Sequence, residues 1–435
     1  MSSSGPIVSR FDARRGPSQR RGAWGRLADL PRLPGGWRPA LALVVALEVA
    51  LALVGLNAHL VGGREPFVGD WESLVIKGSG LIDQVLSQWQ RWDALWYQHI
   101  AQSGYQPGSG SLAFFPLYPL LSRALSLVTF GNVVIAELVL SGSAFAVALW
   151  LLWHLTEHEM GSLVTHQGEA GQSVTQGAAA PLLSVLLVAF FPTAFFFLGP
   201  FTEGLFLLLV LASLSCSRTG RHWQAGLFGF LAGLTRAQGI FLMLPLAYEH
   251  LRQRGSLSWL LRRGGQGPSP ALLASAMPAL GLAVFGLYQM TVLHGHAGLL
   301  GTEAPWGYQF VTPWQAIGAS LRYIDTVTNT NGAYVEVLNL AGLIVFTAVA
   351  AVAVRKLPFA YSLYTLQSVG ILLFREMWMS PLMSVSRLIL VIFPCFWIIA
   401  AWLAPRPRVA ALWLVVSLFL QLALFQYFTR WGFVA

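Results

Sequence analysis

The sequence predicts an all-α polytopic membrane protein, and three observations lead to that fold class. Hydrophobic residues make up 55% of the 435 residues and charged residues only 10%, whereas about 25% of residues are charged in soluble domains. Apolar runs long enough to cross a hydrocarbon core of about 30 Å recur from residue 40 onward. No polar stretch between them is long enough for a separate soluble domain, so a single membrane domain is expected over residues 39–435.

Residues 1–38, which precede the first apolar run, are basic and rich in Gly, Pro and Ser. This composition predicts a disordered leader, and its excess of arginine predicts a cytoplasmic N-terminus. The apolar run that follows lacks a clear small-residue cleavage site, so a retained signal anchor is expected. The arginines behind the net charge of +9 collect between apolar runs, which indicates membrane orientation and not a nucleic-acid partner.

The first crossing is expected over about residues 40–62, which places residues 63–111 on the extracytoplasmic side. Two loosely helical stretches in that segment, 71–90 and 92–102, predict short helices lying on the membrane surface. Further apolar runs bring the expected total to about 10–13 crossings. These runs cover about residues 112–130, 133–153, 179–198, 203–216, 223–250, 270–293, 336–354, 358–374, 386–403 and 408–428.

Three later basic segments predict cytoplasmic turns. They contain Arg252, Arg254, Arg262 and Arg263, then Arg355 and Lys356, then Arg406 and Arg408. Residues 294–335 and 375–386 lie between these turns and are expected outside, the first as a second large loop. Residues 157–178 are polar and compositionally simple, which predicts a flexible loop on a side that charge does not settle. The run 223–250 predicts either one long helix or two short helices meeting near residues 235–239.

Asp93 is the main catalytic candidate. It lies in RWDALWYQHIAQSGY, residues 91–105, where a carboxylate beside apolar surroundings is costly unless it has a partner or a function. Flanking Trp92 and Trp96 would partly desolvate it and strengthen it as a base. The alternative is a structural ion pair with Arg91.

Helical spacing places Trp92, Trp96 and His99 on one face, and Tyr105 follows them. These side chains are candidates for substrate binding. The alternative for the tryptophans and the tyrosine is an interfacial aromatic belt.

Three charged residues lie deep in apolar runs farther along the chain. Glu203 follows a proline-bounded turn and is either a helix N-terminal charge or a ligand for substrate hydroxyls. Arg236 and Arg387 would each bind a phosphate, or would form an internal ion pair with a buried acid. The acids considered for that pairing are Glu48 and Glu137.

Metal and nucleotide motifs are missing from the sequence. His154, His158 and His166 straddle a helix end and a polar tract, and no DxD, HExxH or CxxC accompanies them. Cys216 and Cys395 both lie in apolar runs, so no disulfide framework is expected. There is no P-loop and no GxGxxG before a helix. The expectation is a protein without a metal, cofactor or soluble nucleotide donor.

The run RWDALWYQHIAQSGY, followed by AFFPLYPLL, closely resembles the PIG-V-like mannosyltransferase family, relatives of the enzyme that adds the second mannose to GPI anchors. Further blocks are similar to that family: FPTAFFFLGPFTEGLF, GLTRAQGIFL, EAPWGYQFVTPW and SRLILVIFP. The resemblance covers roughly residues 40–400, with the blocks in order.

The resemblance implies a GT-C glycosyltransferase fold, with the catalytic carboxylate in the first extracytoplasmic loop and a polyprenyl-phosphate-linked sugar as donor. It implies that Asp93 is a general base for an inverting transfer to a glycan, glycolipid or protein acceptor at the bilayer. The resemblance also implies that Arg236, Arg387 or His99 would stabilise the departing phosphate. With the candidates taken from the residues themselves, the expected substrate-binding set is Arg91, Trp92, Trp96, His99, Tyr105, Glu203, Arg236 and Arg387.

The chain departs from the family pattern at two places. QPGSGSL lacks the acid that many members have before Phe-Phe-Pro, and Leu388 replaces the aromatic residue that commonly follows the last arginine. Asp93 is therefore expected to act as the base alone. The expected activity is therefore that of an integral-membrane glycosyltransferase that moves a hexose, with mannose as the expected sugar. The Arg/Gly/Pro-rich leader looks bacterial and indicates a plasma-membrane protein, so GPI as the acceptor is not carried over.

The main competing hypothesis is a polytopic transporter or flippase of a lipid-linked or amphipathic substrate. Such a protein would also have many helices and buried charges, but transporters usually show paired halves, and no internal repeat is evident here. A lipid-scrambling or structural subunit is the third hypothesis, and it needs no Asp93.

Overall fold

The computed structural model describes residues 37–61, 72–107, 109–164, 173–255, 269–293, 308–328, 330–377 and 379–434. Parts of three predicted segments lie outside the described residues: the leader up to residue 36, the middle of the loop 157–178, and residues 294–307 of the predicted second external loop.

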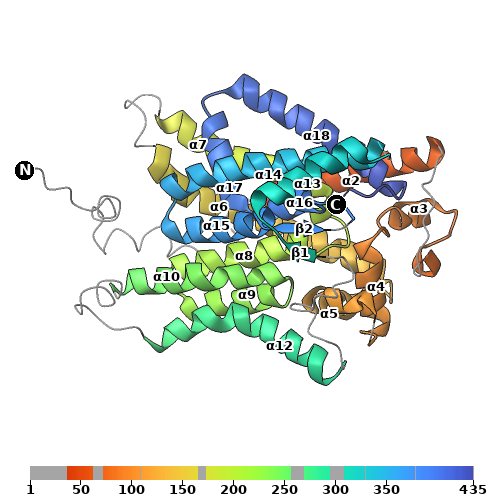
Figure 1. The fold of residues 1–435 in the computed structure, drawn as a ribbon, viewed down its shortest axis with the longest axis horizontal. Helices are drawn as coiled ribbons and strands as arrows, with labels where there is room; N and C mark the ends of the chain where they lie inside the picture. Colours follow the sequence, from red (N-terminus) through yellow and green to blue (C-terminus); the bar gives the residue numbers. More distant parts are fainter. Residues whose placement is uncertain are drawn as a thin grey trace, which may run out of the picture.

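The described residues form a bundle of helices with one small sheet, which confirms the predicted all-α polytopic membrane fold (Figure 1). The helices are α2 (Trp37–Val61), α3 (Leu81–Ser87), α4 (Asp93–Ser103), α5 (Leu117–Ser126), α6 (Val133–Val164), α7 (Ser173–Ala189), α8 (Glu203–Arg218), α9 (His222–Gly233), α10 (Met243–Gln253), α12 (Met277–Thr291), α13 (Pro313–Thr326), α14 (Thr330–Lys356), α15 (Phe359–Leu373), α16 (Val385–Leu388), α17 (Phe393–Leu403) and α18 (Pro407–Thr429). Short 3-10 helices cover Glu72–Leu74, Gly110–Ala113, Ala194–Phe197, Ala237–Leu242, Pro270–Ala276 and Ile389–Val391.

Five helices of the described residues are long and apolar enough to cross a bilayer, and six if a bent pair counts as one span. The five are Trp37–Ala58, Val133–Glu159, Pro270–Thr291, Asn331–Lys356 and Pro407–Thr429; the bent pair, Val385–Val391 with Phe393–Leu403, turns by 81°. The predicted total of about 10–13 crossings also counts shorter helices. One of these is α8, which is buried along almost its whole length.

The run 223–250 is broken, as the second of its two predicted alternatives requires. Helix α9 ends at Gly233, a 3-10 segment follows from Ala237, and α10 begins at Met243. Gly239 permits the close approach of this segment to the end of α9, because a Cβ there would lie 2.5 Å from the backbone of Ala232. Within the break the backbone of Arg236 is extended.

The segment predicted to be the first external loop contains short helices, as expected, and α4 is the one that packs most closely against the bundle. Most of its residues are buried, and it packs against α5 and α6. The run 112–130 forms only the ten-residue helix α5, which is too short to cross a bilayer. Pro116 precedes α5, so the proline-rich AFFPLYP segment forms the entry to that helix.

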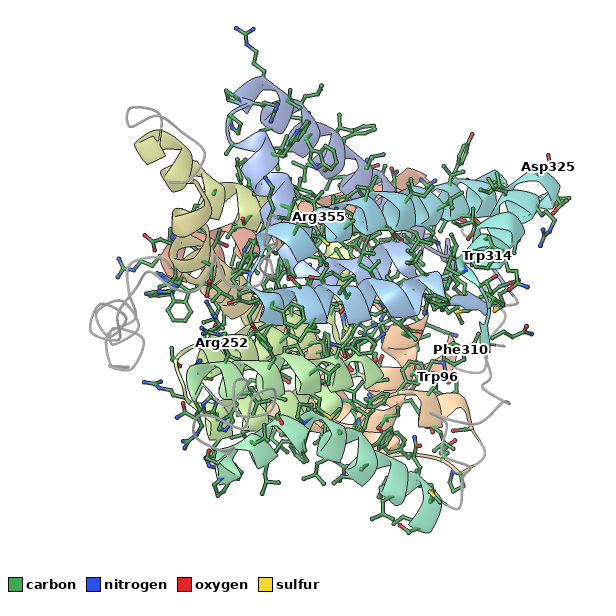
Figure 2. The ribbon with its side chains drawn as sticks, turned by 60° about the vertical axis from the view of Figure 1, so that its left-hand side comes forward. Trp96, Arg252, Phe310, Trp314, Asp325 and Arg355 are labelled. Atoms are coloured by element: carbon green, nitrogen blue, oxygen red, sulfur yellow. The ribbon has the colours of Figure 1, made fainter. Side chains whose placement is uncertain are left out.

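Two segments predicted to lie outside are joined by the small sheet. Strand β1 (Tyr308–Phe310) pairs antiparallel with β2 (Arg375–Met377), so residues from the two predicted external regions, 294–335 and 375–386, lie side by side. Helices α3 and α4 lie at one end of the bundle, and the sheet lies beside α13, nearer the middle of the view (Figure 1). Trp96, Phe310 and Trp314 lie on the side of the molecule opposite to Arg252 (Figure 2).

Candidate active site

Asp93 is the first residue of α4 and forms a salt bridge with an arginine from the far end of the sequence. Arg387 donates from Nη1 to Asp93 Oδ2 at 2.5 Å. The helix N-terminus also favours a carboxylate at this position. The Asp93 side chain keeps 29% of its exposure, whereas Arg387 is buried. Within the described residues, Oδ1 of Asp93 accepts no hydrogen bond, so this oxygen can accept one from another group.

Arg387 also forms a salt bridge with a second acid, the buried Glu203. Nε of Arg387 donates to Oε1 of Glu203, which also accepts from Nη1 of Arg236. Glu203 is fully buried at the first position of α8. Asp93, Arg387, Glu203 and Arg236 therefore form a continuous charge chain of two carboxylates and two guanidinium groups, with a formal charge of zero. Such a chain satisfies charges that would be very costly alone in an apolar interior.

Close helix packing brings Glu203 into this position. Gly204 follows it on α8, and a Cβ at Gly204 would lie 2.8 Å from the carbonyl oxygen of Phe197 and 3.1 Å from that of Ser141 on α6. Only a glycine allows α8 to approach α6 this closely without a shift of backbone. The FTEG sequence thus supplies both the acid and the close contact that buries it.

Two aromatic rings contact the side chain of Arg387, and a hydrogen bond fixes the backbone of the preceding residue, Ser386. Its guanidinium carbon lies 4.9 Å from the centroid of the Phe196 ring and 4.8 Å from that of Phe201, distances at which a cation is attracted to an aromatic face. The hydroxyl of Thr193 donates to the carbonyl of Ser386 at 2.6 Å. The FFPTAFFFLGPF block therefore shapes the site around Arg387.

The structure corrects the predicted ion pairs. The acid that pairs with Arg236 is Glu203, and Arg387 pairs with both Glu203 and Asp93, so the alternatives Glu48 and Glu137 are wrong. The alternative pairing of Asp93 with Arg91 is also wrong, because Asp93 pairs with Arg387.

Arg91 lies beside the site but is turned toward backbone carbonyls. It is buried and donates to the carbonyls of Thr429, Ser87 and Gln90. Trp92 packs edge-on against Trp431. Arg91 also lies over the ring of Trp431. Arg91 and Trp92 therefore both contact the end of α18 and the residues after it, which the sequence did not indicate as part of the site.

The remaining candidates lie on α4 and after it, and their described contacts are with residues other than Asp93. Trp96 stacks on Phe114 with ring centroids 5.6 Å apart. The hydroxyl of Tyr105 donates to the carbonyl of Phe114 at 2.8 Å, which uses its proton within the protein. His99 is buried, and desolvation lowers its pKa, so a neutral imidazole is favoured at this position.

A second charge cluster lies at the other end of α8. Arg218 donates to Glu159 and Glu249, and Arg252 donates to Glu249. Because α8 begins at Glu203 and ends at Arg218, the two clusters are separated by the full length of this buried helix. Neither cluster groups three or more possible metal ligands, and no such group occurs elsewhere in the described residues.

The arrangement around Asp93 combines a partly exposed carboxylate with buried cations. A carboxylate can accept a proton, and nearby cations can stabilise an anion that forms beside it.

A family model described as mannosyltransferase (PIG-V) matches residues 71–309, more than half of the chain. The matched region includes Asp93, Glu203 and Arg236, while Arg387 lies beyond it. A comparison with curated proteins finds no match. The chain therefore belongs to the mannosyltransferase (PIG-V) family and is a multi-pass integral membrane protein.

Proposed function

We propose that the protein transfers a hexose, with mannose the first choice, from a polyprenyl-phosphate donor to an acceptor hydroxyl, with inversion at the anomeric carbon, in a GT-C fold. The observation that carries the proposal is the position of Asp93 at the exposed end of the charge chain. Arg387 fixes one carboxylate oxygen, and the other accepts nothing from the described residues. A base held in one orientation with a free oxygen is the geometric requirement for this chemistry.

In the proposed reaction, Oδ1 of Asp93 takes the proton of the acceptor hydroxyl. The acceptor oxygen forms its bond to the anomeric carbon while the bond from that carbon to the phosphate oxygen breaks on the opposite face. The electron pair of the broken bond leaves with the lipid phosphate. Asp93 acts as the only carboxylate base in this scheme, without a metal or cofactor.

The two arginines are the proposed phosphate ligands. Arg236 contacts Glu203 and Thr202 through Nη1 alone, and Arg387 contacts its two acids through Nη1 and Nε. Their other N–H groups have no acceptor in the described residues. Guanidinium donors in a desolvated site strengthen their hold as the phosphate gains charge in the transition state. Neutral His99 contributes a hydrogen bond in this scheme and not a charge.

The proposed topology places Asp93 outside the cytosol and the N-terminus inside, in a bacterial plasma membrane. This orientation is supported by Arg252, which lies on the opposite side of the molecule from Trp96 of α4 (Figure 2), since cytoplasmic loops are enriched in Lys and Arg. A polyprenyl-phosphate sugar and a glycan, glycolipid or protein acceptor would then meet at the outer leaflet.

A donor screen with the full chain in lipid nanodiscs tests the proposal. Polyprenyl-phosphate mannose, glucose and arabinose would each be offered with a panel of glycan, glycolipid and peptide acceptors, and GDP-mannose would serve as the soluble-donor control. The expected result is transfer from polyprenyl-phosphate mannose and none from GDP-mannose, with the anomeric configuration of the product opposite to that of the donor. Failure with every lipid-linked donor would overturn the proposal and favour the transporter or flippase.

A further inference from the structure

The residue before Asp93 has a backbone conformation that bulky side chains rarely adopt. Trp92 has φ 53° and ψ −123°, a region that glycine enters easily and a tryptophan enters only under strain. Its carbonyl accepts from the amide of Leu95 at 3.1 Å, and the carbonyl of Arg91 accepts from the amide of Ala94 at 3.1 Å. These two bonds close the first turn of α4 around Asp93, so the strained conformation of Trp92 sets where the Asp93 carboxylate points.

A second strained tryptophan lies in contact with the first. Helix α18 ends in a Schellman motif, in which Trp431 donates to the carbonyl of Phe428 and Gly432 donates to that of Tyr427, both at 3.0 Å. Glycine is the usual residue at the left-handed position of this motif. Here Trp431 occupies it, with φ 71°. A strained residue persists only where its surroundings hold it in place.

Side chains from the start of α4 contact side chains and backbone at the end of α18. The guanidinium carbon of Arg91 lies 4.3 Å from the centroid of the Trp431 ring. Nε and Nη2 of Arg91 donate to the carbonyl of Thr429 at 3.0 and 2.8 Å. Trp92 packs edge-on against Trp431 and Phe433, with centroid separations of 6.2 and 5.1 Å. These contacts join the end of α18 to the start of α4 across more than 330 residues of sequence.

We propose that residues 429–433, held by Arg91 and Trp92, form a clamp that positions Asp93 for catalysis, with Trp431 as its main positioning residue. The inference rests on the proposed function, since it concerns the orientation of the proposed base. Trp431 acts through the backbone of Trp92 and does not contact substrate. Residues 429–433 lie outside the matched family region, so that match does not assign them this role.

The test uses the Trp431→Gly variant of the full chain in nanodiscs. Glycine suits the left-handed position, so α18 keeps its end while the ring that contacts Arg91 and Trp92 is lost. The expected result is a fall in kcat of roughly 10- to 100-fold, the scale of a misplaced catalytic group, with the KM for the donor nearly unchanged. Trp431→Phe restores an aromatic ring and is expected to recover much of the kcat. Trp413→Ala, which removes an indole from the exposed face of the same helix, is the matched control and keeps wild-type kcat.

Amide hydrogen exchange provides a readout that does not depend on sugar transfer. The clamp predicts faster exchange in peptides that contain Ala94 and Leu95 of the Trp431→Gly variant, and wild-type exchange there in Trp413→Ala. Unchanged exchange in those peptides, or kcat within about twofold of wild type in Trp431→Gly, overturns the clamp. If the wild-type protein transfers no sugar from any donor, the proposed function fails, and the exchange measurement alone still decides whether Trp431 holds the start of α4.

Discussion

Replacing Glu203 by glutamine tests whether the buried charge chain is a phosphate site. The substitution keeps the shape of the side chain but removes its negative charge, which leaves Arg236, Arg387 and Asp93 with a net charge of +1. Glu203 is fully buried, and both arginines that donate to it are largely buried. Removal of one partner from a buried ion pair costs about 3–5 kcal/mol, so we expect a loss of stability of that size.

A lipid phosphate is expected to restore part of the lost stability, because its charge replaces that of the missing carboxylate. If the uncompensated cations lower the Kd for polyprenyl phosphate by about tenfold, the ligand stabilises the variant by about 1.4 kcal/mol more than it stabilises the wild type. The assay is unfolding of the purified protein in mixed micelles by titration with SDS, with and without farnesyl phosphate. Polyprenol without phosphate is the ligand control.

Glu137→Gln is the matched protein control. Glu137 is also a buried glutamate, on α6, but it has no salt bridge with any described residue. This variant is expected to respond to farnesyl phosphate as the wild type does. The reasoning would be refuted if Glu203→Gln were as stable as the wild type without ligand, or if farnesyl phosphate stabilised both proteins equally.

Two further predictions concern other parts of the molecule. Arg218→Met removes the buried cation shared by Glu159 and Glu249, so it should lower the free energy of unfolding by about 3–5 kcal/mol. The KM for the donor should stay unchanged, because this cluster lies at the far end of α8 from Glu203. A raised KM would contradict this separation of the two clusters. Burial lowers the pKa of His99 below its usual 6.5, so the unfolded chain binds more protons there and stability falls as pH decreases below that value. His99→Gln should weaken this dependence between pH 7 and 5 in SDS titrations, and an unchanged slope would contradict the assignment.

The sequence was sufficient to predict the membrane fold, because the fold depends on local patterns, and a local pattern also singled out Asp93 as the catalytic candidate. Apolar run length predicted helices such as α14, and a carboxylate among aromatic residues indicated Asp93. The break at Arg236 was one of two alternatives, since a glycine inside an apolar run is compatible with either a continuous or a broken helix.

The pairing of the charges was not predictable from the sequence, because it depends on tertiary packing. Arg387 is separated by 294 residues from Asp93 and by 184 residues from Glu203. Glu48 and Glu137 were equally plausible partners by composition. Trp431 was missed for a different reason: a tryptophan near a helix end is typical of an interfacial belt, and its positive φ is visible only in the structure.

The proposal that Asp93 is the catalytic base is tested most directly by the Asp93→Asn variant, with Asp83→Asn on the neighbouring helix α3 as the control. Asparagine keeps the size of the side chain, and Arg387 retains Glu203 as a partner, so the variant should fold normally. We predict that Asp93→Asn lowers kcat for transfer from polyprenyl-phosphate mannose by at least about 100-fold, the lower end of general-base contributions, whereas Asp83→Asn keeps wild-type activity. A well-folded Asp93→Asn protein that transfers mannose at the wild-type rate would contradict the account.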